Sequence, residues 1–208
     1  MRATAFSKAI ALCMAGMAIA SSPAMAQQAG GASAEEPAPQ QQPAEPAPST
    51  GGAEYDAQNA AMTQQVPGFQ AVLLPSGYAA APELAPDSVK QAVWAANQIV
   101  GLPYKYGGGH NARFRSVGYD CSGTVSYALH GGGLLESPLD SGSFMKWGQK
   151  GPGQWITVYT NPGHAFAVIA GLRLDTSAAS DPSGLRGPRW RPALRSTRGF
   201  RARHFDGL

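Results

Sequence analysis

The apolar residues between positions 87 and 100 recur at the spacing of one helix face, which predicts a helix over residues 87–100. Either Asp87 or Ser88 is expected to cap this helix. A second helix is expected over residues 121–130, because apolar residues again recur at helical spacing and a run of glycines follows. A short third helix is expected over residues 141–147.

Beyond residue 153 the apolar and polar residues alternate, as they do in strands with one buried face. Helices that come first and strands that follow, with short connections between them, predict an α+β domain on an antiparallel sheet. The strands are expected at residues 155–160, 164–170, 172–176 and 200–205.

The first residues have the pattern of an export signal. Arg2 and Lys8 precede an apolar run, residues 9–20, that is too short to span a bilayer as a helix. The small residues of Ala-Met-Ala at 24–26 fit cleavage by a signal peptidase. We therefore expect residues 1–26 to be a signal peptide, and the mature chain to lie outside the cytoplasm without an integral membrane segment.

The next segment differs in composition from the rest of the chain. Residues 27–60 are rich in Pro, Gln, Ala and Glu, with Tyr55 as their only aromatic residue, so we expect a disordered linker. Residues 61–86 contain apolar residues broken by prolines and glycines. They either pack on the domain as an extended lead-in or cover its groove. Residues 87–208 suffice for one domain with its own core.

Charge is divided unevenly along the chain. Residues after position 87 hold 14 of the 16 lysines and arginines but only 6 of the 13 acidic residues, so the expected domain is basic. Seven of these arginines lie between Arg186 and Arg203. They form either a solvated, salt-bridged end of the domain or a face that binds an anionic polymer. Nucleic acid is not expected as a partner, because no helix-turn-helix, zinc or stacking-aromatic pattern accompanies the charge.

Cys121 is the strongest candidate for chemistry. Removal of the signal peptide takes Cys13 away and leaves Cys121 as a single thiol in an oxidising environment. Such a thiol is buried and inert, paired with another chain, or reactive. Cys121 opens a predicted helix directly after a loop, where the backbone N–H groups and the helix dipole favour a thiolate. We therefore interpret Cys121 as a nucleophile.

A cysteine nucleophile needs a base, which the fold brings to it from elsewhere in the sequence. Of the four histidines, His110 lies in a polar loop, His130 on the helix of Cys121, and His204 in the basic C-terminal segment. His164 follows a Pro-Gly turn at the start of a predicted strand, which is a rigid position facing a helix start. We therefore expect His164 to be the base.

The strand after His164 supplies a candidate third residue. Pairing residues 164–169 with the strand that follows the Ala-Gly turn places Asp175 opposite Phe166, on the face of His164. Asp175 would then fix the imidazole tautomer and support the charged ring. A slip of one residue would instead place Thr176 beside His164, and a surface carboxylate without a catalytic role is the alternative for Asp175.

Three segments carry a resemblance to a known family. PYKYGG (103–108), YDCSG (119–123) and PGHAFAVIAG (162–171), in this order and after an export signal, resemble the NlpC/P60 cysteine peptidases. The resemblance covers roughly residues 88–178. It implies a papain-like α+β fold, with the nucleophile at a helix start packed on a small antiparallel sheet. It also implies hydrolysis of peptidoglycan stem peptides between D-γ-glutamyl and diaminopimelic acid residues, and a secreted, extracellular, periplasmic or wall-associated protein.

The family's catalytic residues match Cys121 as the nucleophile and His164 as the base. Its orienting polar residue, usually histidine, asparagine or glutamine, falls at or beside Asp175. The sequence also departs from the family pattern. The loop of residues 108–120 is longer than usual, and Gly-Gln-Trp at 153–155 replaces an acidic turn.

Three further residues gain a role from the same resemblance. Tyr104 matches a tyrosine whose hydroxyl lies near the oxyanion, although it could instead be a packing aromatic. Asp120 and Ser122 match positions that in some members hold the amino end of the stem peptide. Asp120 could equally serve only to cap the helix of Cys121.

No metal or other cofactor is expected, because no group of histidines, cysteines or carboxylates has ligand spacing. We expect a monomer whose partners are peptidoglycan stem peptides and anionic wall polymers, the latter bound through the Arg-rich C-terminal region. Two alternatives stay open. One is an amidase or acyl-transferring thiol enzyme on the same fold, and the other is a non-catalytic wall-binding protein.

Overall fold

The computed structural model describes residues 57–208. The predicted signal peptide, residues 1–26, and residues 27–56 of the predicted linker lie outside this part of the chain. Residues 57–62 are helical. Residues 57–60, which the sequence led us to place in the linker, are therefore the start of a helical segment.

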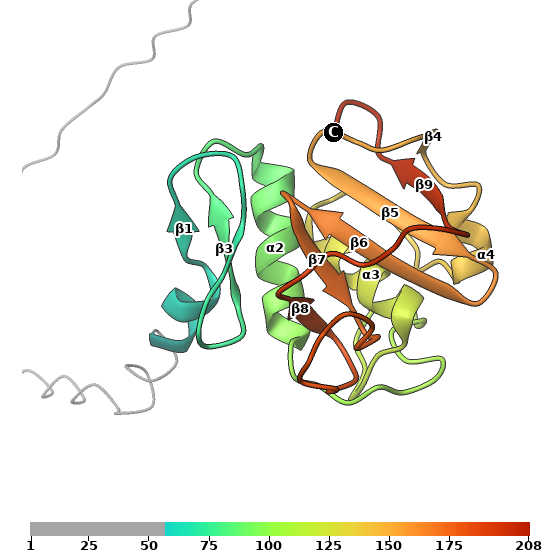
Figure 1. The fold of residues 1–208 in the computed structure, drawn as a ribbon, viewed down its shortest axis with the longest axis horizontal. Helices are drawn as coiled ribbons and strands as arrows, with labels where there is room; N and C mark the ends of the chain where they lie inside the picture. Colours follow the sequence, from blue (N-terminus) through green and yellow to red (C-terminus); the bar gives the residue numbers. More distant parts are fainter. Residues whose placement is uncertain (1–56) are drawn as a thin grey trace, which may run out of the picture. The chain divides into compact units, whose positions relative to one another are not determined.

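The strands of the C-terminal half form a six-stranded antiparallel sheet in the order β4-β9-β5-β6-β7-β8 (Figure 1). The expected period-two segments correspond to its central strands, within one or two residues at each end. The six strands are β4 (Gln149–Lys150), β5 (Ile156–Asn161), β6 (His164–Ile169), β7 (Leu172–Asp175), β8 (Arg189–Arg191) and β9 (Arg201–His204).

Helices α2 (Asp87–Ile99) and α3 (Cys121–Gly131) pack against each other, and α3 lies on strands β6 and β7. The short helix α4 (Ser141–Phe144) contacts β5 and is shorter than the sequence predicts. The α+β fold class is therefore confirmed. Apolar side chains from α2, α3 and the sheet share one core, which includes Val89, Val93, Val125, Leu129, Ile169 and Leu174.

The start of α2 differs from the prediction. Pro86 occupies the capping position and makes no side-chain capping bond, so neither Asp87 nor Ser88 caps the helix. Asp87 instead lies in the first turn and pairs with Lys90 at 3.3 Å. A carboxylate in the first turn is favourable at the positive end of the helix dipole.

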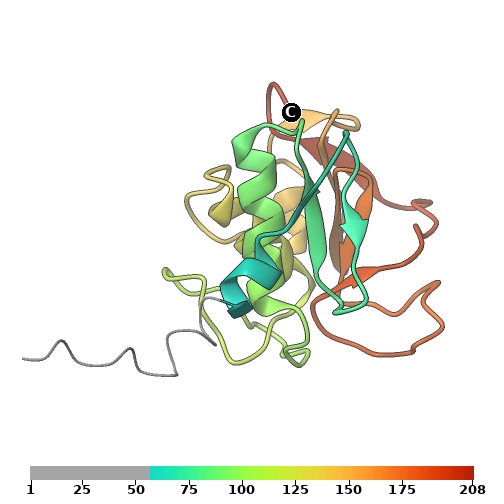
Figure 2. The same cartoon turned by 90° about the vertical axis from the view of Figure 1, so that its left-hand side faces the viewer.

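The segment of residues 61–86 packs on the domain rather than over its groove. It forms a small sheet of β1 (Gln65–Val66), β2 (Val72–Leu73) and β3 (Ala79–Pro82), in the order β1-β3-β2, and β3 contacts α2 (Figure 2). The buried amide of Asn97 fastens the two elements together. It accepts from the N–H of Ala79 at 2.9 Å and donates to the carbonyl of the same residue at 2.9 Å.

Strand β8 was not predicted, because its sequence Arg-Trp-Arg does not read as a half-buried strand. Both Trp190 and Arg191 are buried. Burial of a guanidinium is costly unless its N–H groups find hydrogen-bond partners. The Arg191 side chain meets this condition by donating to the Asp181 carboxylate and to the carbonyl oxygens of Asp175, Leu185 and Gly187.

Candidate active site

Cys121 is the first residue of α3, and the glycine loop, residues 107–109, packs directly on this helix start. Asp120 caps the helix, its carboxylate accepting from the N–H of Gly123 at 2.7 Å. A side chain at Gly123 would collide with the carbonyl of Gly108, so only glycine allows this close approach of the loop. Cys121 itself is 9% exposed and unpaired with any other cysteine in the described residues.

His164 begins β6, next to the tight turn that joins it to β5. The side-chain oxygen of Asn161 accepts from the backbone N–H groups of Gly163 and His164, at 3.0 and 2.9 Å, and this fixes the turn. Nε2 of the His164 ring lies 2.9 Å from Oδ1 of Asp175. The other ring nitrogen, Nδ1, is not used by this contact, and the ring lies close enough to the Cys121 thiol for each group to shift the pKa of the other.

Asp175 ends β7 with a side chain that is fully buried. Strands β6 and β7 pair Ala167 with Leu174 and Ile169 with Leu172. The predicted hairpin register is therefore confirmed, and Asp175 lies on the same face as His164. Oδ1 of Asp175 also accepts from the N–H of Ser177 at 2.8 Å. The carboxylate is thus held against the imidazole by the backbone beyond the strand.

The pKa values of the three groups are shifted in the directions that an ion pair requires. Burial raises the pKa of the Cys121 thiol, but hydrogen bonds from the His164 ring and the Ala165 N–H outweigh it and lower the pKa overall. Burial lowers the pKa of His164, but hydrogen bonds to Asp175 and Cys121 prevail and raise it to about 9. These opposite shifts favour a thiolate in contact with an imidazolium.

The pKa of Asp175 is lowered despite its burial. Burial alone raises the pKa of this carboxyl, but the hydrogen bonds from His164, from the Ser177 N–H and from Arg195 lower it by more. Asp175 is therefore an anion at neutral pH, where His164 carries its proton. A carboxylate in this state accepts the ring N–H and stabilises the imidazolium.

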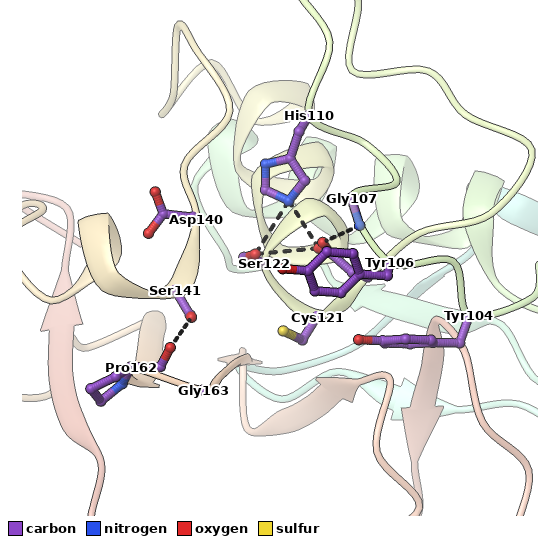
Figure 3. Close-up of a pocket in the computed structure, with 11 residues that line it drawn as sticks. Tyr104, Tyr106, Gly107, His110, Cys121, Ser122, Asp140, Ser141, Pro162 and Gly163 are labelled. Atoms are coloured by element: carbon purple, nitrogen blue, oxygen red, sulfur yellow. Dashed lines mark hydrogen bonds and ion pairs between the residues drawn. The ribbon is translucent and has the colours of Figure 1, made fainter.

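A pocket of about 470 Å³ opens in front of the Cys121 sulfur. In Figure 3 the hydroxyl of Tyr104 points toward this sulfur from the other side of the pocket. Tyr104 is 41% exposed, and the pKa of its hydroxyl is raised by burial and by the nearby Cys121 and Asp120. The pocket is lined by Tyr104, Tyr106, Gly107, His110, Asp120, Cys121, Ser122, Asp140, Ser141, Pro162 and Gly163 (Figure 3).

Asp120 and Ser122 both reach the pocket, together with His110, which sequence reasoning set aside as a loop residue. Nε2 of His110 lies 2.9 Å from Oδ1 of Asp120 and 3.3 Å from Oγ of Ser122. The second carboxylate oxygen of Asp120 accepts from the N–H of Gly107 at 3.0 Å. Asp120 therefore both caps α3 and ties the glycine loop and His110 to the pocket wall. No sequence signal singled out His110, because its partners lie across a loop closure.

The opposite rim of the pocket was also not predicted. Asp140 caps α4, where its carboxylate accepts from the N–H of Ser143 at 2.8 Å. The hydroxyl of Ser141 donates to the carbonyl of Pro162 at 3.1 Å and so joins α4 to the turn before His164 (Figure 3). This rim consists of capping and turn residues, whose proximity to a nucleophile depends on the tertiary fold.

The long loop between Gly108 and Asp120 is anchored at its middle by an aromatic residue. Phe114 is 1% exposed, and its ring stacks on that of His130, with ring centroids 4.0 Å apart. Nothing in the sequence predicted a core residue in the middle of this polar loop. The anchored loop carries His110 at its start to the pocket.

The C-terminal arginines are divided between the interior and the surface. Arg191 and Arg203 are buried, whereas Arg186, Arg198 and Arg201 are exposed. Within residues 57–208, no group of three or more metal-ligating side chains has a geometry that could hold a metal ion. The same residues contain no helix that is long and apolar enough to cross a membrane.

No family model and no curated protein sequence matches the chain. Among solved structures, the chain is similar to the peptidoglycan hydrolase RipB from Mycobacterium tuberculosis, with 22% sequence identity and a TM-score of 0.42. The likeness covers 56% of this chain and 64% of the RipB chain, which is less than two thirds of the latter. A likeness of this extent establishes neither a family nor an activity, so the function has to be inferred from the residues of the site.

Proposed function

We propose that this protein is a secreted cysteine peptidase of the NlpC/P60 type that hydrolyses amide bonds in peptidoglycan stem peptides. The bond proposed is that between D-γ-glutamyl and diaminopimelic acid residues. The observation that carries the proposal is the position of the His164 ring, which hydrogen-bonds to the buried carboxylate of Asp175 and lies close enough to the Cys121 thiol to lower its pKa. This is the nucleophile–base–orienter arrangement of thiol hydrolases.

The proposed reaction has two half-reactions. The Cys121 thiolate attacks the carbonyl carbon of the scissile amide, and the His164 imidazolium gives its proton to the leaving amine as the C–N bond breaks. The product is a thioester between Cys121 and the acyl part of the substrate. A water molecule, deprotonated by the now neutral His164, then attacks the thioester carbonyl and releases a carboxylic acid and the free thiol.

The oxyanion that forms in both steps needs hydrogen-bond donors. Backbone N–H groups in the first turn of a helix have no partner within the helix, and Cys121 stands at such a position in α3. The hydroxyl of Tyr104 points to the same sulfur from across the pocket (Figure 3). We assign it as a second donor, which the raised pKa of this hydroxyl supports, because it stays protonated.

Asp120 and Ser122 are proposed to bind the substrate on the side of the pocket that His110 also lines. The carboxylate of Asp120 already accepts from the N–H groups of Gly123 and Gly107 and contacts the side chains of His110 and Ser122. A positively charged amino end of the substrate would therefore replace the contact with the His110 ring, which lines the pocket. The exposed C-terminal arginines, Arg198 and Arg201, remain available to bind an anionic wall polymer.

Digestion of purified peptidoglycan, with identification of the fragments by mass, tests the proposal. Cleavage at the expected bond releases a new amino group on diaminopimelic acid. Release of whole stem peptides from the glycan would identify an amidase, and transfer to an added amine would identify an acyltransferase. Sedimentation with peptidoglycan without any fragments, equal for wild type and Cys121→Ala, would identify a wall-binding protein and contradict the proposal.

A further inference from the structure

We infer that Arg195 is a positioning residue for the proposed catalytic site, and that it acts by holding the carboxylate of Asp175 against His164. The inference rests on the proposed function, since it gives Asp175 the task of orienting the base. Arg195 lies 20 residues beyond Asp175 in the basic C-terminal segment. Nothing in the sequence connects it with the nucleophile or the base.

The two oxygens of Asp175 have different partners. Oδ1 accepts from His164 at 2.9 Å and from the Ser177 N–H at 2.8 Å. Oδ2 accepts from Nη1 of Arg195 at 3.2 Å. Contacts on both oxygens fix the rotation of the carboxylate about its Cβ–Cγ bond. The orientation of Oδ1 toward the imidazole therefore depends on the bond that Arg195 makes to Oδ2.

The guanidinium of Arg195 is itself held by two aromatic rings. It lies 5.3 Å from the ring centroid of Phe166 and 5.3 Å from that of Phe200. Phe166 and Phe200 contact each other edge to face, and Phe200 also packs edge to face against the His164 ring. A planar guanidinium stacks on aromatic faces while its N–H groups point outward in the plane, which suits the bond to Asp175.

A second arginine near Asp175 does not supply the same bond. Nε of Arg173 lies 3.8 Å from Oδ2, beyond hydrogen-bond distance, and has no hydrogen-bond partner among the described residues. Arg173 therefore contributes positive charge to the surroundings of Asp175 but does not orient its carboxylate. The directional contact on Oδ2 comes from Arg195, whose side chain is also the more exposed of the two.

A series of contacts connects Arg195 to Cys121. Arg195 holds Asp175, Asp175 holds the N–H at Nε2 of His164, and His164 presents Nδ1 to Cys121. When the carboxylate is free to turn, the ring loses its fixed direction and the thiolate loses the imidazolium that stabilises it. The pKa of the Cys121 thiol then rises toward its ordinary value, and the reactive thiolate becomes scarcer at neutral pH.

The test measures the reactivity of Cys121 without any substrate. The rate of alkylation by iodoacetamide is followed as a function of pH on the full chain, with the modified peptide quantified by mass so that Cys13 does not interfere. In Arg195→Ala we expect the pH at which Cys121 becomes reactive to move upward, and its rate near pH 7 to fall on the order of 10-fold, the effect of about one pKa unit. Arg195→Lys, which keeps a donor and a charge, should recover part of this loss.

The matched control is Arg113→Ala, which removes the same charge at an exposed position that has no contact with Asp175. Its alkylation profile should coincide with that of the wild type. An Arg195→Ala profile that coincides with the wild type would overturn the inference, and so would an equal shift in Arg113→Ala. A folded Lys variant as slow as the Ala variant would also overturn it, because a donor to Asp175 would then not be what Arg195 supplies.

The same experiment separates failure of this inference from failure of the proposed function. If Cys121 of the wild type reacts only at the pH of an ordinary thiol, the proposed pair of thiolate and imidazolium is wrong. If the wild type is reactive at lower pH and Arg195→Ala is equally so, only the role of Arg195 is wrong. Hydrolysis of a stem peptide provides the second readout, with an expected loss of kcat of about 10- to 100-fold in Arg195→Ala and little change in KM.

Discussion

Nε2 of His164 lies 2.9 Å from Oδ1 of Asp175, at the open end of the hairpin that β6 and β7 form. The turn of this hairpin consists of Ala170 and Gly171, both with positive φ values, 47° and 84°. Two-residue turns of this kind match the twist of the flanking strands and so fix their register. The proximity of His164 and Asp175, the proposed base and orienting carboxylate, is therefore set by a local turn, which explains why it could be predicted from the sequence.

The first prediction concerns the nucleophile. Cys121→Ala should abolish hydrolysis of peptidoglycan and of soluble stem peptides, because no other thiol lies in the described part of the chain. The variant should melt close to the wild type, since a small side chain is lost at the edge of a pocket. Hydrolysis assays and thermal unfolding measure the two effects. Turnover at the wild-type rate in a folded Cys121→Ala variant would refute the assignment of the active site.

The second prediction compares two substitutions of the orienting carboxylate. Asp175→Ala should lower kcat by about 10²- to 10⁴-fold, because the nucleophile and the oxyanion donors remain while the base loses its fixed tautomer. It should also destabilise the fold, since Arg195 and the fully buried Arg173 lose their shared partner. Asp175→Asn should fall within the same range. If the amide oxygen of the Asn variant faces His164, its NH₂ group faces the N–H donor of Arg195, and the bond to Arg195 is lost. If the NH₂ group faces His164 instead, Nε2 of the ring has to accept, which selects the wrong tautomer.

Thr176→Val is the matched control for this comparison. Thr176 follows Asp175 directly beyond the end of β7 and is buried, and valine has nearly the same volume. We expect its kcat to stay within about twofold of the wild type, as for a site without contact to the reacting groups. A Thr176→Val variant that is crippled while Asp175→Ala is active would mean that the catalytic strand pairs differently in solution.

The sequence predicted those parts of the site that depend on local structure. The position of Cys121 at a helix start followed from the loop-to-helix pattern, and the position of Asp175 beside His164 followed from strand alternation and the turn that sets the hairpin register. His110 and Arg195 were not recognisable. Each reaches the site through a loop whose path depends on distant packing, such as the stacking of Phe114 on His130 or the aromatic rings around the guanidinium.

The basic C-terminal segment shows a different limit of sequence reasoning. Its charge suggested either a solvated face or a polymer-binding face, and both readings place the arginines outside. Arg191 instead lies in the core, where its guanidinium reaches carbonyl groups that no sequence pattern reveals. Charge density along a chain indicates the partners of a surface only when the charged side chains are at the surface.

The third prediction is the pH dependence of turnover. The active form carries a thiolate at Cys121 and an imidazolium at His164, so kcat/KM should rise with pH through the lowered pKa of the thiol. It should fall again as pH rises through about 9, the raised pKa of His164, where the proton needed by the leaving amine is lost. In Asp175→Ala the fall of kcat/KM at high pH should occur at a lower pH, because the carboxylate is a principal cause of the raised pKa of His164. If the fall stays at the wild-type pH, it reports the titration of another group.

The fourth prediction concerns the segment before the domain. A chain that lacks residues 27–56 should hydrolyse small soluble peptides at the wild-type rate, because the pocket is formed by residues after position 100. In the intact chain this segment should give the narrow amide chemical shifts of a disordered peptide, as its composition predicts. The deletion stops before residue 57 because the carbonyl of Asn59 accepts hydrogen bonds from Thr63 in the helical turn that follows. A loss of activity on small peptides would show that the segment contributes to the site.

The last prediction tests whether the ring of Phe114 holds the long loop between Gly108 and Asp120. Phe114 is 1% exposed and stacks on His130, although it has a positive φ of 56° that a bulky residue rarely adopts. Burial and stacking of the ring must therefore outweigh the backbone strain.

Removal of the ring in Phe114→Ala should cost about 3–5 kcal/mol of unfolding free energy, as for other buried aromatic residues. It should also raise KM, because the loop carries His110 to the pocket wall. Val117→Ala, at a position of the same loop that is 76% exposed, should change neither quantity. Urea unfolding and steady-state kinetics of both variants decide the matter: equal stability of Phe114→Ala and Val117→Ala would mean that other contacts hold the loop.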